Sequence, residues 1–257
     1  MIMIMIMIMI LFFVLIVLKI VGKHIVARTM TTGPNTRGLF VTFEGIDGSG
    51  KSTIMRLVAE KYRNEARVYH DPGGTSFGED ARALIFAARK LSAWTEALIF
   101  AAARYQLSYE HIIPDLDNGL LVLCDRYIDS SLIYQGYAQC DLCTRAHRES
   151  DPISACQSIR AICSINSHPN LAIPHLTILL DAQVTTCMER MAARACCGIA
   201  LNRFDEASTD HFERIREGYA KLARDSGGRI VTIDAMQPID QIVSNVIGLI
   251  EKMKKKI

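Results

Sequence analysis

The sequence predicts an α/β fold in which helices cover both faces of a five-stranded parallel sheet. The first observation is a set of short apolar runs at residues 39–43, 68–69, 120–124, 175–180 and 229–233. The second is that segments with helical apolar spacing separate these runs. Parallel strands need such connections, because each helix returns the chain to the edge where the next strand begins.

The elements can be justified in chain order. Residues 39–43 (LFVTF) are continuously apolar apart from one threonine, as expected for a strand buried on both faces. Residues 52–63 then carry apolar side chains at helical spacing. Later amphipathic segments predict helices at residues 94–116, 210–224 and 239–252. Residues 145–170 are interpreted as a helical excursion that ends at Pro169. No boundary for a second domain lies within residues 39–257.

The first 29 residues are interpreted as an apolar, low-complexity extension. Residues 1–18 are uninterrupted apolar residues that begin with five Met-Ile repeats, and a membrane span needs about 17–25 such residues. They are either a membrane anchor or the product of an upstream start, with translation otherwise beginning at Met30; we favour the second interpretation. Residues 30–38 are polar, contain glycine and proline, and read as a linker.

Charge and cysteine content narrow the class of protein. The formal net charge is only +2, so we expect a nucleotide as partner and no nucleic acid. The chain of 257 residues can build a large core without disulfides, so its eight cysteines are expected to be reduced thiols of a cytoplasmic protein. The spacing of Cys140, Cys143, Cys196 and Cys197 is a poor match to a zinc site.

A phosphate-binding motif follows the first strand. Residues 43–53 read FEGIDGSGKST and contain G-x-x-x-x-G-K-S between a strand and a helix. In such loops the backbone N–H groups cradle phosphates, the lysine reaches the β and γ oxygens, and the serine hydroxyl binds Mg²⁺. The alternative is a chance match in a glycine-rich turn. The expected ATP-binding residues are Gly45, Ile46, Asp47, Gly48, Ser49, Gly50, Lys51, Ser52 and Thr53.

Two further motifs follow predicted strands. Residues 70–75 (HDPGGT) place a carboxylate and a rigid turn at a strand end, where α/β sheets bind ligands. Residues 125–136 (DRYIDSSLIYQG) follow the strand at 120–124. The Asp125 carboxylate could hold Mg²⁺ through a water molecule. Arg126 could bind a phosphate, because its guanidinium can donate two parallel hydrogen bonds. The alternative is an Asp-Arg ion pair with a structural role.

Together the three motifs resemble the thymidylate kinase family in order and spacing, from about residue 39 to the C-terminus. The resemblance implies a P-loop NTPase fold of three layers with a short mobile lid at about residues 194–207. It implies transfer of the γ-phosphoryl group of ATP to dTMP, with Mg²⁺ as cofactor held by Ser52 and Asp125, and a homodimer. Residues 39–257 would form this domain.

The resemblance also implies the dTMP site. Phe100 would stack on thymine and Arg104, one helical turn later, would donate to a base carbonyl. Arg126 would grip the dTMP phosphate, Ser131 would contact the base and Tyr134 would pack against the sugar. Asp71, Pro72 and Gln135 complete the expected substrate site. Without the resemblance, Phe100 reads as a core residue.

Charges near the γ-phosphate pose a separate problem. Some family members carry an arginine after the P-loop aspartate, where this chain has Gly48. The resemblance therefore assigns that function to arginines of the lid region, namely Arg190, Arg194 and Arg203, which otherwise read as solvated surface charges. Asp47 would face the acceptor and accept from the 3′-hydroxyl of dTMP or bind Mg²⁺ through water.

Two departures and two rival functions stay open. In the first departure, His70 and Asp71 replace the family's Arg-Glu, which puts the affinity for substrate in doubt. In the second, the lid segment at residues 196–202 is apolar and contains cysteines, which puts the alignment of the lid arginines in doubt. One rival is another nucleoside monophosphate kinase, and the other is a membrane-anchored nucleotide-binding module that uses residues 1–18. A GTPase is disfavoured, because the chain has no N-K-x-D guanine motif.

Overall fold

The structure is a computed structural model that describes residues 38–87, 91–139, 153–196 and 208–256. The chain divides into two units, Met1–Thr32 and Gly33–Ile257, and all described residues belong to the second. The expectations for residues 1–29, for most of the linker and for the lid after Cys196 therefore lie outside the described residues. No helix in the described part is long and apolar enough to cross a membrane.

The five predicted strands form one parallel sheet, which confirms the predicted fold class. The sheet order is β2-β3-β1-β4-β5, and all four neighbouring pairs are parallel. The strands are β1 (Leu39–Glu44), β2 (Ala66–His70), β3 (Leu121–Asp125), β4 (Leu176–Asp181) and β5 (Ile230–Asp234). β1 occupies the centre and is paired on both sides, so its carboxyl end lies between those of β3 and β4.

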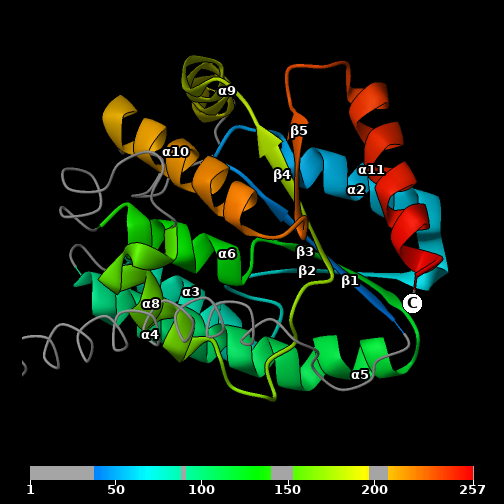
Figure 1. Cartoon of the computed structure of the whole chain (residues 1–257), viewed down its shortest axis with the longest axis horizontal. Helices are drawn as coiled ribbons and strands as arrows, with labels where there is room; N and C mark the ends of the chain where they lie inside the picture. Colours follow the sequence, from blue (N-terminus) through cyan, green and yellow to red (C-terminus); the bar gives the residue numbers. More distant parts are fainter. Residues whose placement is uncertain (1–37, 88–90, 140–152, 197–207, 257) are drawn as a thin grey trace, which may run out of the picture. The chain divides into compact units, whose positions relative to one another are not determined.

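Helices and helical turns connect the strands. The α-helices are α2 (Lys51–Tyr62), α3 (Ser76–Ala87), α4 (Ala93–Leu107), α5 (Ile113–Asp117), α6 (Ile128–Ser131), α8 (Gln157–Ile165), α9 (Val184–Cys196), α10 (Thr209–Asp225) and α11 (Ile239–Lys254). Shorter turns are η1 (Arg63–Glu65), η2 (Ser108–Ile112), η3 (Leu132–Tyr137) and η4 (Ile153–Ala155). Figure 1 shows α2 and α11 on one side of the sheet and α4, α5 and α10 on the other.

Local sequence explains where several helices begin and end. Ser92 caps α4 by accepting a hydrogen bond from the Thr95 backbone N–H at 3.1 Å. The single helix expected at residues 94–116 is instead α4, the π-helical turn η2 and α5. Pro114 lies in the first turn of α5, where its missing N–H is tolerated. α3 was not among the predicted helices.

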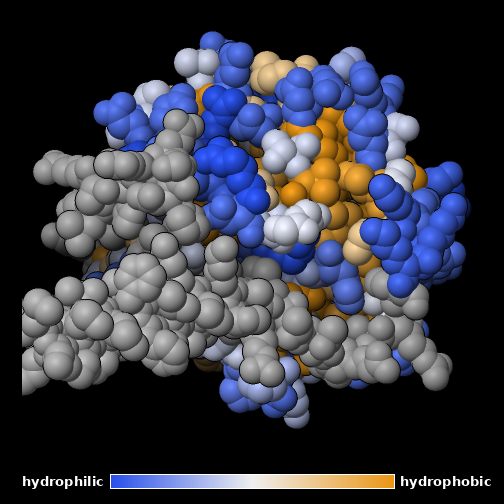
Figure 2. Space-filling model, viewed as in Figure 1, coloured by the Kyte–Doolittle hydropathy of each residue, from blue (hydrophilic) through white to orange (hydrophobic). Residues whose placement is uncertain are grey.

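The core consists of two clusters of buried side chains, which meet β1 on its opposite faces. Val41 of β1 packs in the cluster that includes side chains of α2 and α11. Phe40, its neighbour, packs in the other cluster with Leu107 and Leu116, because successive side chains of a strand point to opposite faces. Figure 2 shows apolar surface among polar side chains on the face that carries β5 and α11.

The cysteines differ in part from the expectation of reduced thiols. Cys124, Cys163, Cys187 and Cys196 are free, whereas Cys156 is in a disulfide. Cys140, Cys143 and Cys197 lie outside the described residues. The expectation that all eight cysteines are reduced is therefore wrong at Cys156.

Candidate active site

The predicted site residues gather at the carboxyl ends of β1, β2 and β3, around two adjoining hollows. We call the first the aromatic cavity; it is lined by Asp47, Asp71, Pro72, Arg82, Phe86, Phe100, Arg104, Arg126, Ser130, Ser131, Tyr134 and Gln135. We call the second the P-loop groove; its lining includes Gly48, Gly50, Lys51, Ser52, Thr53, Asp125, Arg190 and Arg194. Asp47, Asp71, Arg82 and Arg126 line both hollows.

The P-loop has the geometry that its sequence predicts. Gly50 caps α2 with a φ of 96°, in the left-handed region. The buried Lys51 Nζ donates to the carbonyl oxygens of Gly45 and Ile46, both at 3.0 Å. Burial and the nearby Arg126 lower the pKa of Lys51. Ile46 itself belongs to the core, so only its backbone faces the loop.

Ser52 and Asp125 meet in the P-loop groove, as their expected metal role requires. Ser52 Oγ donates to Asp125 Oδ2 at 2.7 Å. A hydroxyl and a carboxylate supply the oxygen ligands that Mg²⁺ prefers, and Mg²⁺ keeps several waters besides. The donor set therefore fits Mg²⁺ beside the phosphate cradle.

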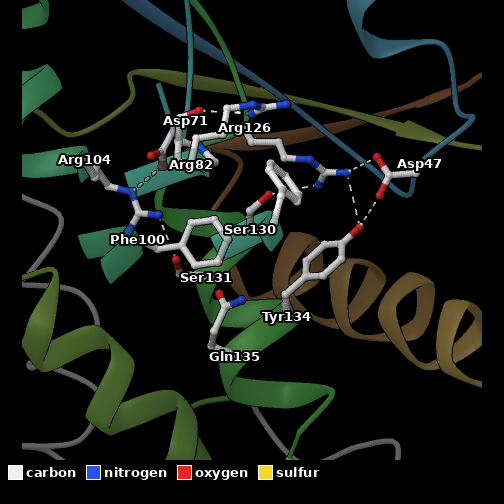
Figure 3. A pocket seen from close by; sticks show the side chains of 12 residues that line it. Asp47, Asp71, Arg82, Phe100, Arg104, Arg126, Ser130, Ser131, Tyr134 and Gln135 are labelled. Carbon is white, nitrogen blue, oxygen red and sulfur yellow. Dashed lines mark hydrogen bonds and ion pairs between the residues drawn. The ribbon is translucent and has the colours of Figure 1, made fainter. Parts of the chain in front are cut away.

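Asp47 is paired with Arg126 across the boundary between the two hollows. Arg126 Nη2 donates to Asp47 Oδ1 at 2.7 Å and to the Tyr134 hydroxyl at 3.2 Å, as Figure 3 shows. Lys51 Nζ lies 3.9 Å from the same carboxylate oxygen. Burial acts to raise the pKa of Asp47, but Arg126 and Lys51 prevail and lower it to about 2. The acid is therefore ionised and balances two cations.

Arg104 is held by three segments of the chain at the wall of the aromatic cavity. Its Nε donates to Asp71 Oδ2 at 2.7 Å, and its Nη2 donates to Ser131 Oγ at 2.7 Å. Its Nη1 donates to Asn166 Oδ1 at 2.6 Å. Burial raises the pKa of Asp71, against the effect of Arg104. Asn166, at the end of α8, was not anticipated from the sequence.

The side chain of Phe100 faces the aromatic cavity, as does that of Arg104, which lies one helical turn after Phe100 on α4 (Figure 3). Pro72, Ser131, Tyr134 and Gln135 complete this wall. The expected dTMP residues thus share one cavity.

Arg82 of α3 is a residue that the sequence reasoning missed. It lines both hollows, donates from Nη1 to the Pro72 carbonyl oxygen at 3.1 Å, and lies over the Phe86 ring at 4.8 Å. The sequence did offer a signal. A helix that directly follows residues 70–75 would be expected to place an arginine near the site, and α3 is that helix.

Two arginines of α9 lie beside the P-loop and line the P-loop groove. Arg190 Nη1 donates to the Gly48 carbonyl oxygen at 3.3 Å, and Arg194 lines the groove. Gly48 has a φ of 83°, and a Cβ placed there would lie 2.4 Å from the Cys187 carbonyl oxygen. The helix therefore rests on the loop where a side chain is absent. Arg203 lies outside the described residues.

His70 lines the P-loop groove, where its side chain pairs with Glu79 of α3. Its Nε2 lies 2.9 Å from Glu79 Oε1, and both side chains are about half exposed. Glu79 Oε1 also accepts from the Gly74 backbone N–H at 2.9 Å. This hydrogen bond is the main cause that lowers the pKa of Glu79, and the nearby His70 acts in the same direction. The pair braces the turn at residues 70–75 beside the groove.

Glu44, the last residue of β1, is a buried acid that the sequence reasoning also left unassigned. It lies beneath the P-loop with none of its side chain exposed. Burial and the nearby Asp129 raise its pKa to about 7, while Arg126 and two hydroxyl donors act in the opposite direction.

Comparison with known proteins gives one consistent result. The family model described as thymidylate kinase matches residues 43–152 and 154–246. A thymidylate kinase of Bacillus cereus (strain ATCC 10987 / NRS 248) is 36% identical over 221 residues, which cover 84% of this chain and 98% of that protein. One from Bacillus thuringiensis (strain Al Hakam) is 35% identical with the same coverage. The crystal structure of thymidylate kinase from Ehrlichia chaffeensis matches with a TM-score of 0.61 at 27% identity, covering 83% of this chain and 98% of that one.

Proposed function

This chain belongs to the thymidylate kinase family, and from that premise we propose that it transfers the γ-phosphoryl group of ATP to dTMP, giving ADP and dTDP. The observation that carries the proposal is the aromatic cavity, where Phe100, Arg104 and Arg126 meet beside a complete P-loop. An aromatic ring, a fixed guanidinium and a phosphate-binding arginine suit a pyrimidine monophosphate.

Side chains of the aromatic cavity would bind and orient dTMP. Phe100 stacks on the base, while Arg104, fixed by Asp71 and Ser131, directs its remaining N–H groups to a base carbonyl. Arg126 holds the acceptor phosphate. Pro72, Tyr134 and Gln135 shape the cavity around the sugar and base, and Arg82 adds a cation at its junction with the groove.

The P-loop groove would hold the phosphates of ATP. The loop at residues 45–53 supplies backbone N–H groups, and Lys51 turns from its carbonyl partners to the β and γ oxygens. Ser52 and Asp125 would hold Mg²⁺, which neutralises charge that develops on the phosphates. The fit of this hydroxyl and carboxylate pair supports the assignment.

The reaction needs positioning more than a general base. The phosphate of dTMP has a second pKa of about 6, so its dianion can attack the γ-phosphorus directly. The phosphate oxygen forms the new P–O bond as the bond to the β-phosphate oxygen breaks. Arg190, Arg194 and Arg203 would stabilise the transferring group, and closure of a lid at about residues 194–207 would exclude water.

We extend the proposal to the setting of the enzyme: a homodimer in the cytoplasm with its kinase domain at residues 39–257. Exposed apolar side chains on the neighbouring helices α3 and α4 support an interface, with Leu84 and Leu98 each 56% exposed. Light scattering checks this: Leu84→Glu should halve the mass of the wild-type particle, and a wild-type monomer would contradict the dimer.

A coupled assay of ADP release tests the proposed activity. The full chain is given ATP, Mg²⁺ and, separately, dTMP, dUMP, AMP and GMP. We expect dTMP to be preferred and Lys51→Ala to lose at least about a hundredfold in rate, as expected when a transition-state charge contact is removed. A preference for AMP or GMP would indicate another monophosphate kinase, and no acceptor-dependent release would overturn the proposal.

A further inference from the structure

The buried Glu44 side chain accepts four hydrogen bonds, three from the segment that follows Arg126 and one from Tyr219 of α10. Its Oε1 accepts from the backbone N–H groups of Tyr127 at 2.9 Å and Ser130 at 3.2 Å. Its Oε2 accepts from two hydroxyls, Ser130 Oγ and the Tyr219 OH, both at 2.7 Å. Glu44 touches neither hollow, so these contacts are with the protein alone.

The same two hydroxyls face Arg126 on their other side. Arg126 Nη1 lies 3.1 Å from Ser130 Oγ and 3.4 Å from the Tyr219 hydroxyl. A guanidinium can only donate, so both hydroxyl oxygens must present lone pairs to it. Each hydroxyl has a single proton, and donation of that proton to Glu44 leaves its lone pairs for Arg126.

We propose that Glu44 is a positioning residue that sets the direction of these hydrogen bonds and so fixes the guanidinium of Arg126 for the acceptor phosphate. The inference rests on the proposed function, since it concerns the arginine assigned to dTMP. Nη2 of Arg126 is held from the other side by Asp47, so Glu44 governs the Nη1 end. Arg126 itself sits at a φ of 66°, and its backbone N–H donates to Phe43 at 3.0 Å.

The isosteric variant Glu44→Gln separates this role from simple packing. The N–H groups of Tyr127 and Ser130 require an oxygen at the Oε1 position, which forces the new amide nitrogen to the Oε2 position. There it donates to the hydroxyls of Ser130 and Tyr219, which lie 3.0 Å apart. One hydroxyl can then donate its proton to the other, but the second proton is left to point toward Arg126. The shape of the core is kept, while the hydrogen-bond direction at Nη1 is reversed for one of the two hydroxyls.

Calorimetric titration of the full chain with dTMP and with thymidine tests the proposal. Thymidine lacks the phosphate that Arg126 would hold. We expect Glu44→Gln to raise the Kd for dTMP by roughly tenfold to a hundredfold, as for a lost bond to a charged group. The Kd for thymidine should stay within about twofold. Tyr219→Phe, which removes one of the two hydroxyls, should give a smaller change of the same kind.

Tyr62→Phe is the matched control, because the Tyr62 hydroxyl donates to Glu251 at 2.8 Å away from the site. Equal losses for dTMP and thymidine, or no loss for either, would overturn the inference. If Glu44→Gln does not fold, the comparison of Tyr219→Phe with Tyr62→Phe decides by the same criterion. The proposed function fails separately, through a wild-type chain that binds no dTMP.

Discussion

Asp47 is the residue whose place in an anion-binding loop most needs a physical reason. Its carboxylate lies 2.7 Å from Arg126 and 3.9 Å from Lys51. Because its pKa is lowered to about 2, it stays ionised whenever the protein is folded at neutral pH. Asp47 thus holds in place two cations that would otherwise repel each other at the junction of the hollows.

Replacing Asp47 with asparagine should impair use of dTMP more than use of ATP. Arg126 loses its ionic partner, whereas Lys51 keeps its two carbonyl partners. We expect the KM for dTMP to rise roughly tenfold, the scale of one charge-assisted hydrogen bond, with a smaller change for ATP. Steady-state kinetics with each substrate varied in turn measures both. The exposed Asp240→Asn on α11 is the control, and an equal rise in the two KM values would refute the assignment.

Among the elements, α9 and the P-loop are joined through Gly48. The conformation at this glycine is left-handed, and a Cβ would lie 2.4 Å from the Cys187 carbonyl oxygen. Arg190 reinforces the contact by its hydrogen bond to the Gly48 carbonyl. A side chain at residue 48 would collide with α9, so the loop cannot carry an arginine there while α9 packs against it. The same packing brings the arginines of α9 to the loop.

Gly48→Ala should weaken this junction. We expect a loss of roughly 1–3 kcal/mol in the free energy of unfolding from the strained φ, together with a lower kcat because α9 is displaced. Urea unfolding and the coupled assay measure the two effects. Gly248→Ala on α11 is the control, since a Cβ there meets nothing within 4 Å and alanine favours a helix by about 0.5–1 kcal/mol. Similar behaviour of the two variants would contradict the packing argument.

The strands were predictable and several helices were not, for a physical reason. Strands buried on both faces are continuous apolar runs, so β1, β3 and β4 stand out in the sequence. α3 exposes Phe77 and Leu84 while burying Ala81 and Ile85, which blurs the apolar stripe that marks an amphipathic helix. Arg82 was lost from the expected site together with that helix.

Motifs predicted most of the residues that face the hollows, with Arg82 among the exceptions, but not the residues behind them. Residues 43–53 and 125–136 carry family-specific spacing, so Lys51, Asp125 and Arg126 could be named in advance. Asn166 and Tyr219 reach the site from α8 and α10, far along the chain. Which side chains these two residues contact depends on the tertiary fold, and the spacing of motifs along the sequence does not predict that.

At the scale of the whole molecule, the buried Glu44 links the active site to stability. An acid whose pKa is about 7 when folded and 4.5 in the reference state binds more protons in the folded chain between those values. Stability therefore falls as pH rises from 4.5 to 7, by roughly 1 kcal/mol per pH unit. Below this window both states are protonated, and above it both are ionised, so the contribution is flat.

The ionised form that orders the hydroxyls around Arg126 is thus the form that destabilises the fold, as expected for a charge placed in the core for function. Glu44→Gln should abolish this dependence, because an amide does not titrate. Urea unfolding gives the free energy of unfolding of each protein at each pH. We expect the wild-type value minus the variant value to fall between about pH 5 and about pH 7 and then to level off. Asp71, whose pKa is also raised by burial, is present in both proteins and cancels. A difference that stays constant between about pH 5 and about pH 7 would contradict the raised pKa, because the folded and unfolded chains would then bind protons at Glu44 equally in this range.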